Sequence, residues 1–171
     1  MLKSLGIFSV AAAAAYAAWL CAAGRRERRE ILSALLSDIS LLKLDICERL
    51  LPLPEALEKL SREKTPCIGA FFSACAKEIR TCEDLPFSEI WGRNAQKELG
   101  EKLTAEELGA LAELGLFLGR YGAGEQREKL ENAERSFEGF LEREQTQGAA
   151  RGRLKAAVTL CAGAVAVILM L

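Results

Sequence analysis

The strongest constraint on the fold of this chain is the uneven distribution of its charged residues. Residues 1–23 contain a single charged side chain, Lys3, and residues 156–171 contain none. The stretch between them therefore holds every other charge of a 171-residue sequence in which 27% of the residues are charged. An apolar run at each end of a charged middle predicts one folded central domain with a hydrophobic segment on either side.

The N-terminal apolar run is long enough to cross a membrane as a helix. Residues 5–23 carry no charge, and about 20 such residues span a hydrocarbon core of ~30 Å. Tyr16 and Trp19 lie toward its end, where aromatic rings favour the membrane interface. A cleaved signal peptide or a lipoprotein signal at Cys21 is the alternative, but the arginines that come directly after it would oppose translocation. We therefore predict an N-terminal transmembrane helix over residues 1–23.

The C-terminal run, residues 156–171, predicts a second transmembrane helix. Its 16 residues reach only ~24 Å as a helix, so flanking cations would have to extend to the interface. An apolar helix that packs in the core or re-enters the membrane is the alternative. The cations that flank both runs on the side of the middle domain are Arg25, Arg26, Arg28, Arg29, Arg151, Arg153 and Lys155. This bias predicts a multi-pass protein of the cell membrane whose central domain, residues 24–155, is cytoplasmic.

The central domain is predicted to be all-α, because apolar residues recur at steps of three and four and β-branched residues are few. One such stripe consists of Leu32, Leu35, Leu36, Ile39, Leu42, Ile46 and Leu50. Proline favours the first turn of a helix, so Pro54 predicts a short helix to about Glu63, and Pro66 predicts the start of the next. A fourth helix is expected from Pro86 or Phe87.

Two more helices are predicted after these. Thr104 and Glu107 have the spacing of a capping box, which marks a helix start. Gly115 and Gly119 lie on one face of that helix and would let a neighbouring helix approach closely. A charged helix with an apolar stripe is expected from Glu125 onward. The predicted fold is an antiparallel six-helix bundle between two terminal transmembrane helices.

The composition argues against catalysis. The sequence contains no histidine, which removes the commonest general base and the commonest metal ligand. The cysteines of the domain (Cys47, Cys67, Cys75 and Cys82) lack the spacing of a zinc site. We predict no catalytic residues, no metal and no cofactor, and no nucleic-acid partner because no basic domain is present. A cysteine-based thiol or metal sensor is left open as a different class of function.

The order of these features resembles a known family. The features are a membrane span, a basic cluster, a long amphipathic helix, the segment Leu53, Pro54, Glu55, Ala56 and Leu57, a lone Trp91, a pair of Leu-Gly dipeptides ending at Gly115 and Gly119, and Gln126. Together they resemble stage III sporulation protein AB of endospore-forming bacteria, over the whole chain. The family commonly has a Ser-Asp-like pair after the second Leu-Gly, where this sequence has Arg120-Tyr121-Gly122.

The resemblance implies a function. The family is similar to the F-type platform proteins of type II secretion and type IV pilus systems. It implies a non-enzymatic platform subunit of the channel between mother cell and forespore after engulfment, located in the outer forespore membrane. The implied partners are stage III sporulation protein AA, a secretion-type ATPase, other channel subunits, membrane lipid and further copies of the chain. A platform protein of a pilus or secretion system is the nearest alternative.

Overall fold

The computed structural model describes residues 16, 24, 26–62, 65–82, 84–118 and 123–168, with the backbone alone for residues 123 and 147–168. These residues divide between two units, one of residues 30–141 and one that combines the described parts of residues 1–29 and 142–171. The folded hydrophobic core belongs to the unit of residues 30–141.

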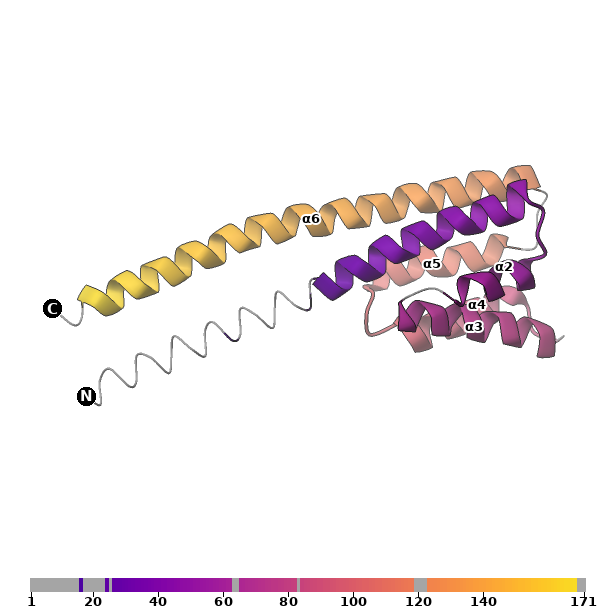
Figure 1. Cartoon of the computed structure of the whole chain (residues 1–171), viewed down its shortest axis with the longest axis horizontal. Helices are drawn as coiled ribbons and strands as arrows, with labels where there is room; N and C mark the ends of the chain where they lie inside the picture. The colour runs from indigo at the N-terminus through magenta and orange to yellow at the C-terminus, as the bar shows by residue number, and fades with distance from the viewer. Residues whose placement is uncertain are drawn as a thin grey trace. The chain divides into compact units, whose positions relative to one another are not determined.

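The described part of the chain is all-α, with six α-helices and no strand, which confirms the predicted class (Figure 1). The first helix covers residues 26–43 and continues into a π-helix, η1, at Leu44–Glu48. The next helices are α2 at Leu53–Leu60, α3 at Pro66–Thr81, α4 at Phe87–Leu99, α5 at Ala105–Phe117 and α6 at Ala123–Ile168.

Local sequence signals explain where several helices begin. Pro66 is the first residue of α3, and Pro86 is the N-cap of α4. Proline is suited to these positions because its fixed φ and its missing N–H cost nothing in the first turn. At α5, the Thr104 hydroxyl accepts a hydrogen bond from the Glu107 N–H, and the Glu107 carboxylate accepts one from the Thr104 N–H. The predicted capping box is therefore confirmed.

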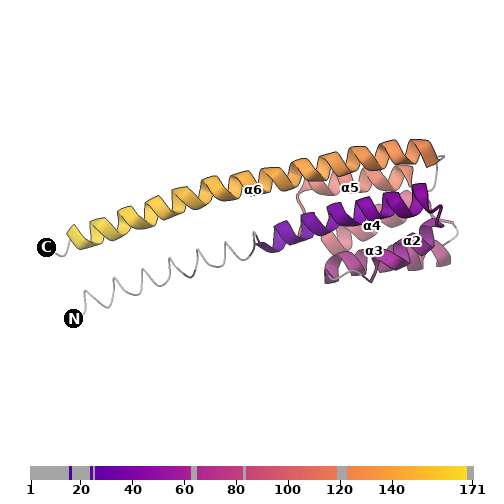
Figure 2. The same ribbon diagram turned by 45° about the horizontal axis from the view of Figure 1, so that its top comes forward.

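Within residues 30–141, one hydrophobic core joins all six helices. Consecutive helices from α2 to α5 pack against one another, and the first helix and α6 both contribute to the same core. The first helix runs beside the early part of α6 in both views (Figures 1 and 2), and an ion pair between Lys43 and Glu134 joins them. The largest fully buried side chains include Trp91, Phe71, Phe72, Phe137 and Leu32.

The prediction that Leu50 continues the buried stripe of the first helix is wrong. Its side chain is 73% exposed, and its φ of 53° lies in the left-handed region. The cause is the end of the helix: η1 stops at Glu48, so Leu50 lies beyond it in non-helical backbone. The Arg49 N–H donates to the Leu44 carbonyl, five residues back, at 3.0 Å. Within η1, Asp45 is the fully buried residue, three positions after buried Leu42.

The predicted N-terminal transmembrane helix falls largely outside the described residues, and the C-terminal one is described by its backbone alone, as far as Ile168. Of residues 1–23, only Tyr16 is described, and it is helical. α6 is one continuous helix as far as Ile168, which includes most of the C-terminal apolar run. Within the described part of the chain, no helix combines the length and the apolar character needed to cross a membrane.

Candidate functional site

A buried carboxylate connects the end of the first helix to α2. Asp45 is fully buried, and its two carboxylate oxygens accept hydrogen bonds from Lys59 Nζ at 2.9 and 2.7 Å. One of these oxygens also accepts from Arg49 Nη1 at 2.7 Å. Both cationic side chains are about half exposed, so their charges remain partly hydrated while they neutralise the carboxylate. The cluster fixes α2 against the turn that precedes it.

The ionisation of Asp45 depends on this geometry. Burial by itself raises the pKa of a carboxyl group because it removes water from the charged form. The hydrogen bonds and positive charges of Lys59 and Arg49 act in the opposite direction and outweigh it, so the pKa of Asp45 lies below its ordinary value. Asp45 is therefore a buried anion at neutral pH, held by two cations from different segments.

Sequence reasoning missed this cluster. Asp45 and Arg49 are four residues apart, a spacing that favours an ion pair on a helix. That spacing could have drawn attention to Asp45. No local signal connects Asp45 with Lys59, which is 14 residues further on and belongs to another helix.

The segment that carries the family resemblance forms the start of α2. Ala56 and Leu57 are buried in the core, whereas Leu53 and Pro54 are half-buried. Glu55 is exposed in the first turn, where a carboxylate interacts favourably with the positive end of the helix dipole. The apolar residues of the segment thus hold α2 on the core, and Glu55 faces solvent at its N-terminus.

Gly115 of α5 lies directly against the Trp91 side chain of α4. A Cβ atom on Gly115 would lie 2.6 Å from Trp91 Cδ1 and 2.8 Å from Trp91 Cγ. The indole is buried and cannot simply move aside, because its Nε1 donates to the Leu111 carbonyl of α5 at 2.7 Å. Its ring also packs on Phe71, with ring centroids 4.7 Å apart. Only a residue without a side chain fits between the two helices at this point.

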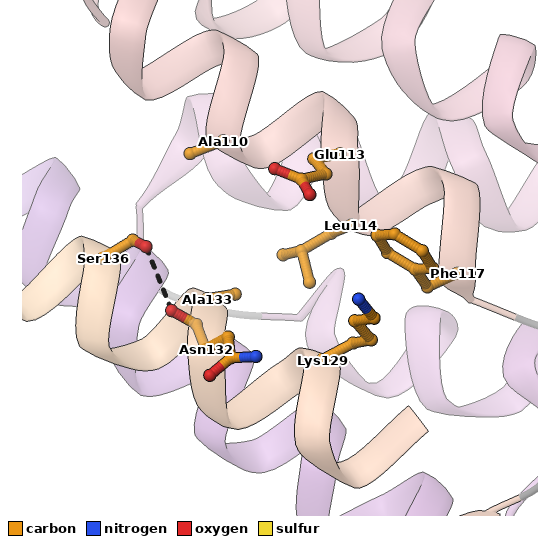
Figure 3. Close-up of a pocket in the computed structure, with 8 residues that line it drawn as sticks. All are labelled: Ala110, Glu113, Leu114, Phe117, Lys129, Asn132, Ala133 and Ser136. Atoms are coloured by element: carbon orange, nitrogen blue, oxygen red, sulfur yellow. Dashed lines mark hydrogen bonds between the residues drawn. The ribbon is translucent and has the colours of Figure 1, made fainter. Parts of the chain in front are cut away.

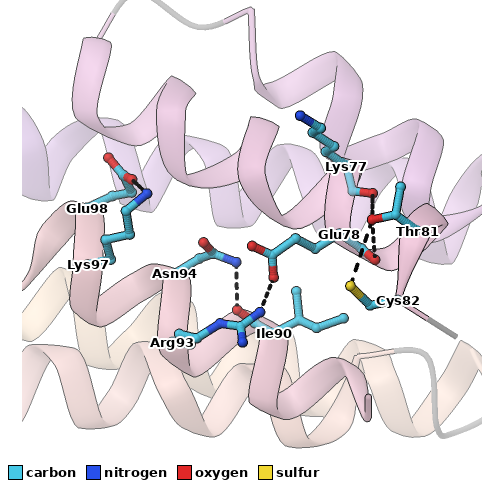
Figure 4. Close-up of polar contacts among 9 residues, drawn as sticks. All are labelled: Lys77, Glu78, Thr81, Cys82, Ile90, Arg93, Asn94, Lys97 and Glu98. Atoms are coloured by element: carbon cyan, nitrogen blue, oxygen red, sulfur yellow. Dashed lines mark hydrogen bonds and ion pairs between the residues drawn. The ribbon is translucent and has the colours of Figure 1, made fainter. Parts of the chain in front are cut away.

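A polar surface joins α3 and α4 (Figure 4). Glu78 of α3 forms an ion pair with Arg93 of α4, which raises the pKa of the Arg93 guanidinium. Next to Arg93 on α4, buried Asn94 donates from Nδ2 to the Ile90 carbonyl at 2.9 Å. The Cys82 thiol lies at the end of α3, 3.8 Å from Thr81 Oγ1. These contacts stabilise the two helices and their packing.

The four domain cysteines are free thiols. Cys75 is buried, and burial raises its pKa to about 12, so its reactive thiolate form is scarce at neutral pH. Burial also raises the pKa of Cys47, although the nearby cations Arg127 and Lys43 oppose this. Among the described residues, no group of three or more acidic, histidine or cysteine side chains is placed to hold a metal ion.

The remaining predicted positions lie apart from one another. Gln126 is buried near the start of α6, with 7% of its surface exposed. Arg26 and Arg29 are exposed, and Arg28 forms an ion pair with Glu144 at 3.3 Å. Outside the described residues lie Gly119 and Arg25, and the side chains of Arg151, Arg153 and Lys155, whose backbone belongs to α6.

Comparison with known proteins identifies the family. The sequence matches the profile of the family described as Stage III sporulation protein AB (spore_III_AB) over residues 3–171. The chain belongs to the stage III sporulation protein AB family. No curated protein sequence matches it.

A solved structure shares the fold. It is described as "Stage III sporulation protein AB (SpoIIIAB)" and superposes with a TM-score of 0.65 at 18% sequence identity. The superposition covers 72% of this chain and 98% of that one. At this identity the likeness establishes the fold alone, which agrees with the helical core of residues 30–141. The family match therefore carries the assignment, and the solved structure supports the architecture.

Proposed function

We propose that the chain is a non-enzymatic membrane platform of the sporulation channel between mother cell and forespore. In this role its helical domain binds the secretion-type ATPase of that system, stage III sporulation protein AA, and other channel subunits. The observation that carries the proposal is the family match over residues 3–171. The helical core supports it, because a packed bundle offers rigid surfaces for protein contacts.

The proposal places the domain of residues 24–155 in the cytoplasm of the mother cell, anchored in the outer forespore membrane at both ends. Support comes from the two apolar runs at residues 1–23 and 156–171 and from the cations beside them. A reporter that is fluorescent only in the cytoplasm provides the test. It should be active when fused after Lys155 and inactive when fused after Leu171. Activity in both fusions would contradict the second membrane crossing.

The chemistry of the domain favours a contact role over the cysteine-based alternative. A thiol sensor needs an accessible thiolate, whereas burial raises the pKa of Cys75 to about 12. The family match favours sporulation over a pilus or secretion system as the setting. The proposal assigns no catalytic step to this chain, so its effect on the channel depends on the proteins that it binds.

Co-purification from sporulating cells tests the platform role. The tagged full chain should retain the ATPase, and a strain that lacks the chain should stop sporulation after engulfment. Gly115→Leu should abolish both ATPase retention and spore formation, because the new side chain would enter the space occupied by Trp91.

Gly92→Leu is the matched control, because a Cβ at Gly92 of α4 would meet nothing within 4 Å. This variant should sporulate normally. If the wild-type chain is stable in the membrane but retains neither the ATPase nor another channel subunit, the platform proposal is wrong.

A further inference from the structure

An unbroken apolar segment lies at the surface where η1 ends and α2 begins. It consists of Leu50, Leu51, Pro52, Leu53 and Pro54, and none of these five residues is buried. Leu50 keeps 73% of its surface accessible, the highest value among the large apolar side chains that the structure describes. A pocket in the groove between α5 and α6 also lies at the surface, but charged and polar side chains line part of it (Figure 3). The apolar segment is therefore the stronger candidate for a contact surface.

The backbone of Leu50 is unfavourable for a leucine. Its φ is 53°, and among the described residues it is the one non-glycine residue with a positive φ. The residue directly after a helix often adopts this left-handed conformation, and it is usually glycine, because a Cβ in this conformation lies close to the next carbonyl oxygen. Leu50 therefore combines backbone strain with an exposed apolar side chain, and a glycine would avoid both. Strain that is kept in this way is typical of functional positions.

Leu50 is also held in one position from both sides. Before it, the Arg49 N–H donates to the Leu44 carbonyl at 3.0 Å, and after it the Leu51 N–H donates to the Asp45 carbonyl at 2.9 Å. The Asp45 carboxylate in turn accepts hydrogen bonds from Lys59 of α2. A side chain on such a rigid backbone loses little conformational freedom when it binds, which favours affinity.

The charges around the segment favour a protein over a lipid surface as its partner. A segment that inserts into an anionic membrane is accompanied by an excess of cations. The side chains that border this segment are balanced instead, with three anions and three cations: Asp45, Glu48 and Glu55, and Arg49, Lys59 and Arg127. An apolar centre with a rim of both charges is typical of a protein–protein interface.

The position of the segment along the first helix favours a partner in the cytoplasm. Glu30 and Glu48 lie on one uninterrupted helix, which at about 1.5 Å per residue separates them by about 25 Å. Glu30 is the end that follows the N-terminal apolar run in the sequence, and Leu50 comes after the opposite end. The helix thus carries the apolar segment away from the residues that lead into that run.

We propose that Leu50 enters an apolar pocket on the ATPase that the platform binds, with Leu51 and Pro52 at the edge of the contact. The proposal rests on the platform role and adds the contact through which the domain holds its partner. A rigid aliphatic anchor in a pocket, surrounded by a polar rim, is an effective arrangement for such a contact. Arg49 is about half exposed beside Leu50 and belongs to that rim.

Leu50→Gly is the decisive variant, because stability and binding should change in opposite directions. The full chain is purified in a mild detergent and titrated with the purified, fluorescently labelled ATPase. Leu50→Gly should raise the dissociation constant about tenfold or more through the loss of the anchor. Its midpoint of thermal unfolding, followed by circular dichroism, should not fall, because glycine relieves the strain at a φ of 53°. A purely structural role for Leu50 predicts that binding stays intact in this more stable variant.

Three more variants separate the side chain from the backbone. Leu50→Ala keeps the strained backbone but loses most of the apolar side chain, so it should weaken binding as Leu50→Gly does. Leu50→Met keeps an apolar side chain of similar size and should bind nearly as tightly as the wild type. Leu116→Ala is the matched control, because it truncates another exposed leucine, on α5, and should leave the dissociation constant unchanged.

Three results would overturn the proposal. If the wild type binds the ATPase and Leu50→Gly and Leu50→Ala bind it equally well, the platform role stands and the contact lies elsewhere. The same result is expected if Leu50 inserts into lipid. Weaker binding by Leu50→Gly but not by Leu50→Ala would assign the effect to the backbone. A wild-type chain that does not bind the ATPase at all would remove both this contact and the ATPase as the partner of the platform.

Discussion

Replacing Gly115 by alanine is expected to destabilise the central domain, although alanine is the better helix former. The new Cβ would lie 2.6 Å from Trp91 Cδ1 and 2.9 Å from Trp91 Cβ, distances that side chains do not tolerate. Either α5 must move away from α4 or the indole must turn. The indole is enclosed, since its ring centroid lies 4.7 Å from that of Phe71 and 5.5 Å from that of Phe87.

The expected magnitude combines three contributions. Overpacking of a filled core costs about 1–3 kcal/mol. A turn of the indole would also weaken the hydrogen bond from Trp91 Nε1 to the Leu111 carbonyl, which is worth about 1 kcal/mol. The higher helix propensity of alanine offsets about 1 kcal/mol of this loss of stability. The net expected loss in the free energy of unfolding is therefore about 1–3 kcal/mol.

Urea unfolding of a fragment spanning residues 24–155 provides the measurement. Trp91 is the only tryptophan in this range, so its fluorescence reports on the packing at the crossing, while circular dichroism monitors the helices. Gly92→Ala is the matched control, because its Cβ would meet nothing within 4 Å on α4. The control should gain about 0.5–1 kcal/mol from helix propensity alone.

The comparison of these two variants isolates the close contact from the general effect of replacing a helical glycine. If Gly115→Ala were as stable as Gly92→Ala, with unchanged Trp91 emission, the crossing would have room for a side chain. The proposed reason for a glycine at this position would then be wrong.

Three further changes test other parts of the structure by the same unfolding measurement. Thr104→Ala removes the hydroxyl that accepts from the Glu107 N–H at 3.3 Å and should cost about 1 kcal/mol. Leu50→Gly should stabilise the domain by about 1 kcal/mol, because glycine adopts a φ of 53° without strain. Leu50→Ala is the control, which keeps the backbone strain and should not stabilise the domain. Asp45→Asn should cost about 1–3 kcal/mol at neutral pH through its weakened hydrogen bonds to Lys59. Because folding lowers the pKa of Asp45, its contribution is complete above the unfolded pKa of about 4 and disappears as the pH falls through the folded pKa. The difference between wild type and Asp45→Asn should therefore narrow on acidification, and a constant difference would contradict the assigned ion pair.

Helix starts were predictable because their signals lie within a few residues of one another. The capping box of Thr104 and Glu107 needs only a spacing of three, and Pro66 acts through its own ring. The end of the first helix was not predictable in this way. A stripe at steps of three and four assumes 3.6 residues per turn, and η1 breaks that assumption at Leu44–Glu48. The helical period therefore gave the wrong burial for Leu50, which lies just beyond the π-helix.

The candidate sites show the same difference between features that follow from neighbouring residues and features that depend on packing. The position of the Leu-Pro-Glu-Ala-Leu segment at a helix start could be predicted from its residues alone. Proline and glutamate favour a first turn, and the apolar residues favour the core. The closeness of Gly115 to a neighbouring helix could be suspected from its place on an apolar helix, but the partner could not. Trp91 lies 24 positions earlier in the sequence, and only the packing of α4 on α5 brings the indole to the glycine.

The sequence by itself determined the helical class, the separation of charged middle from apolar ends, the start of most helices and the absence of histidine. These properties depend on composition and on interactions between residues close in the chain. Only the tertiary structure decided that Asp45 is buried between Lys59 and Arg49 and that Trp91 fills the space at Gly115. The reason is that burial and pairing depend on which helix faces pack together. The residues that meet in this way are far apart in the sequence, so no local pattern indicates their contact.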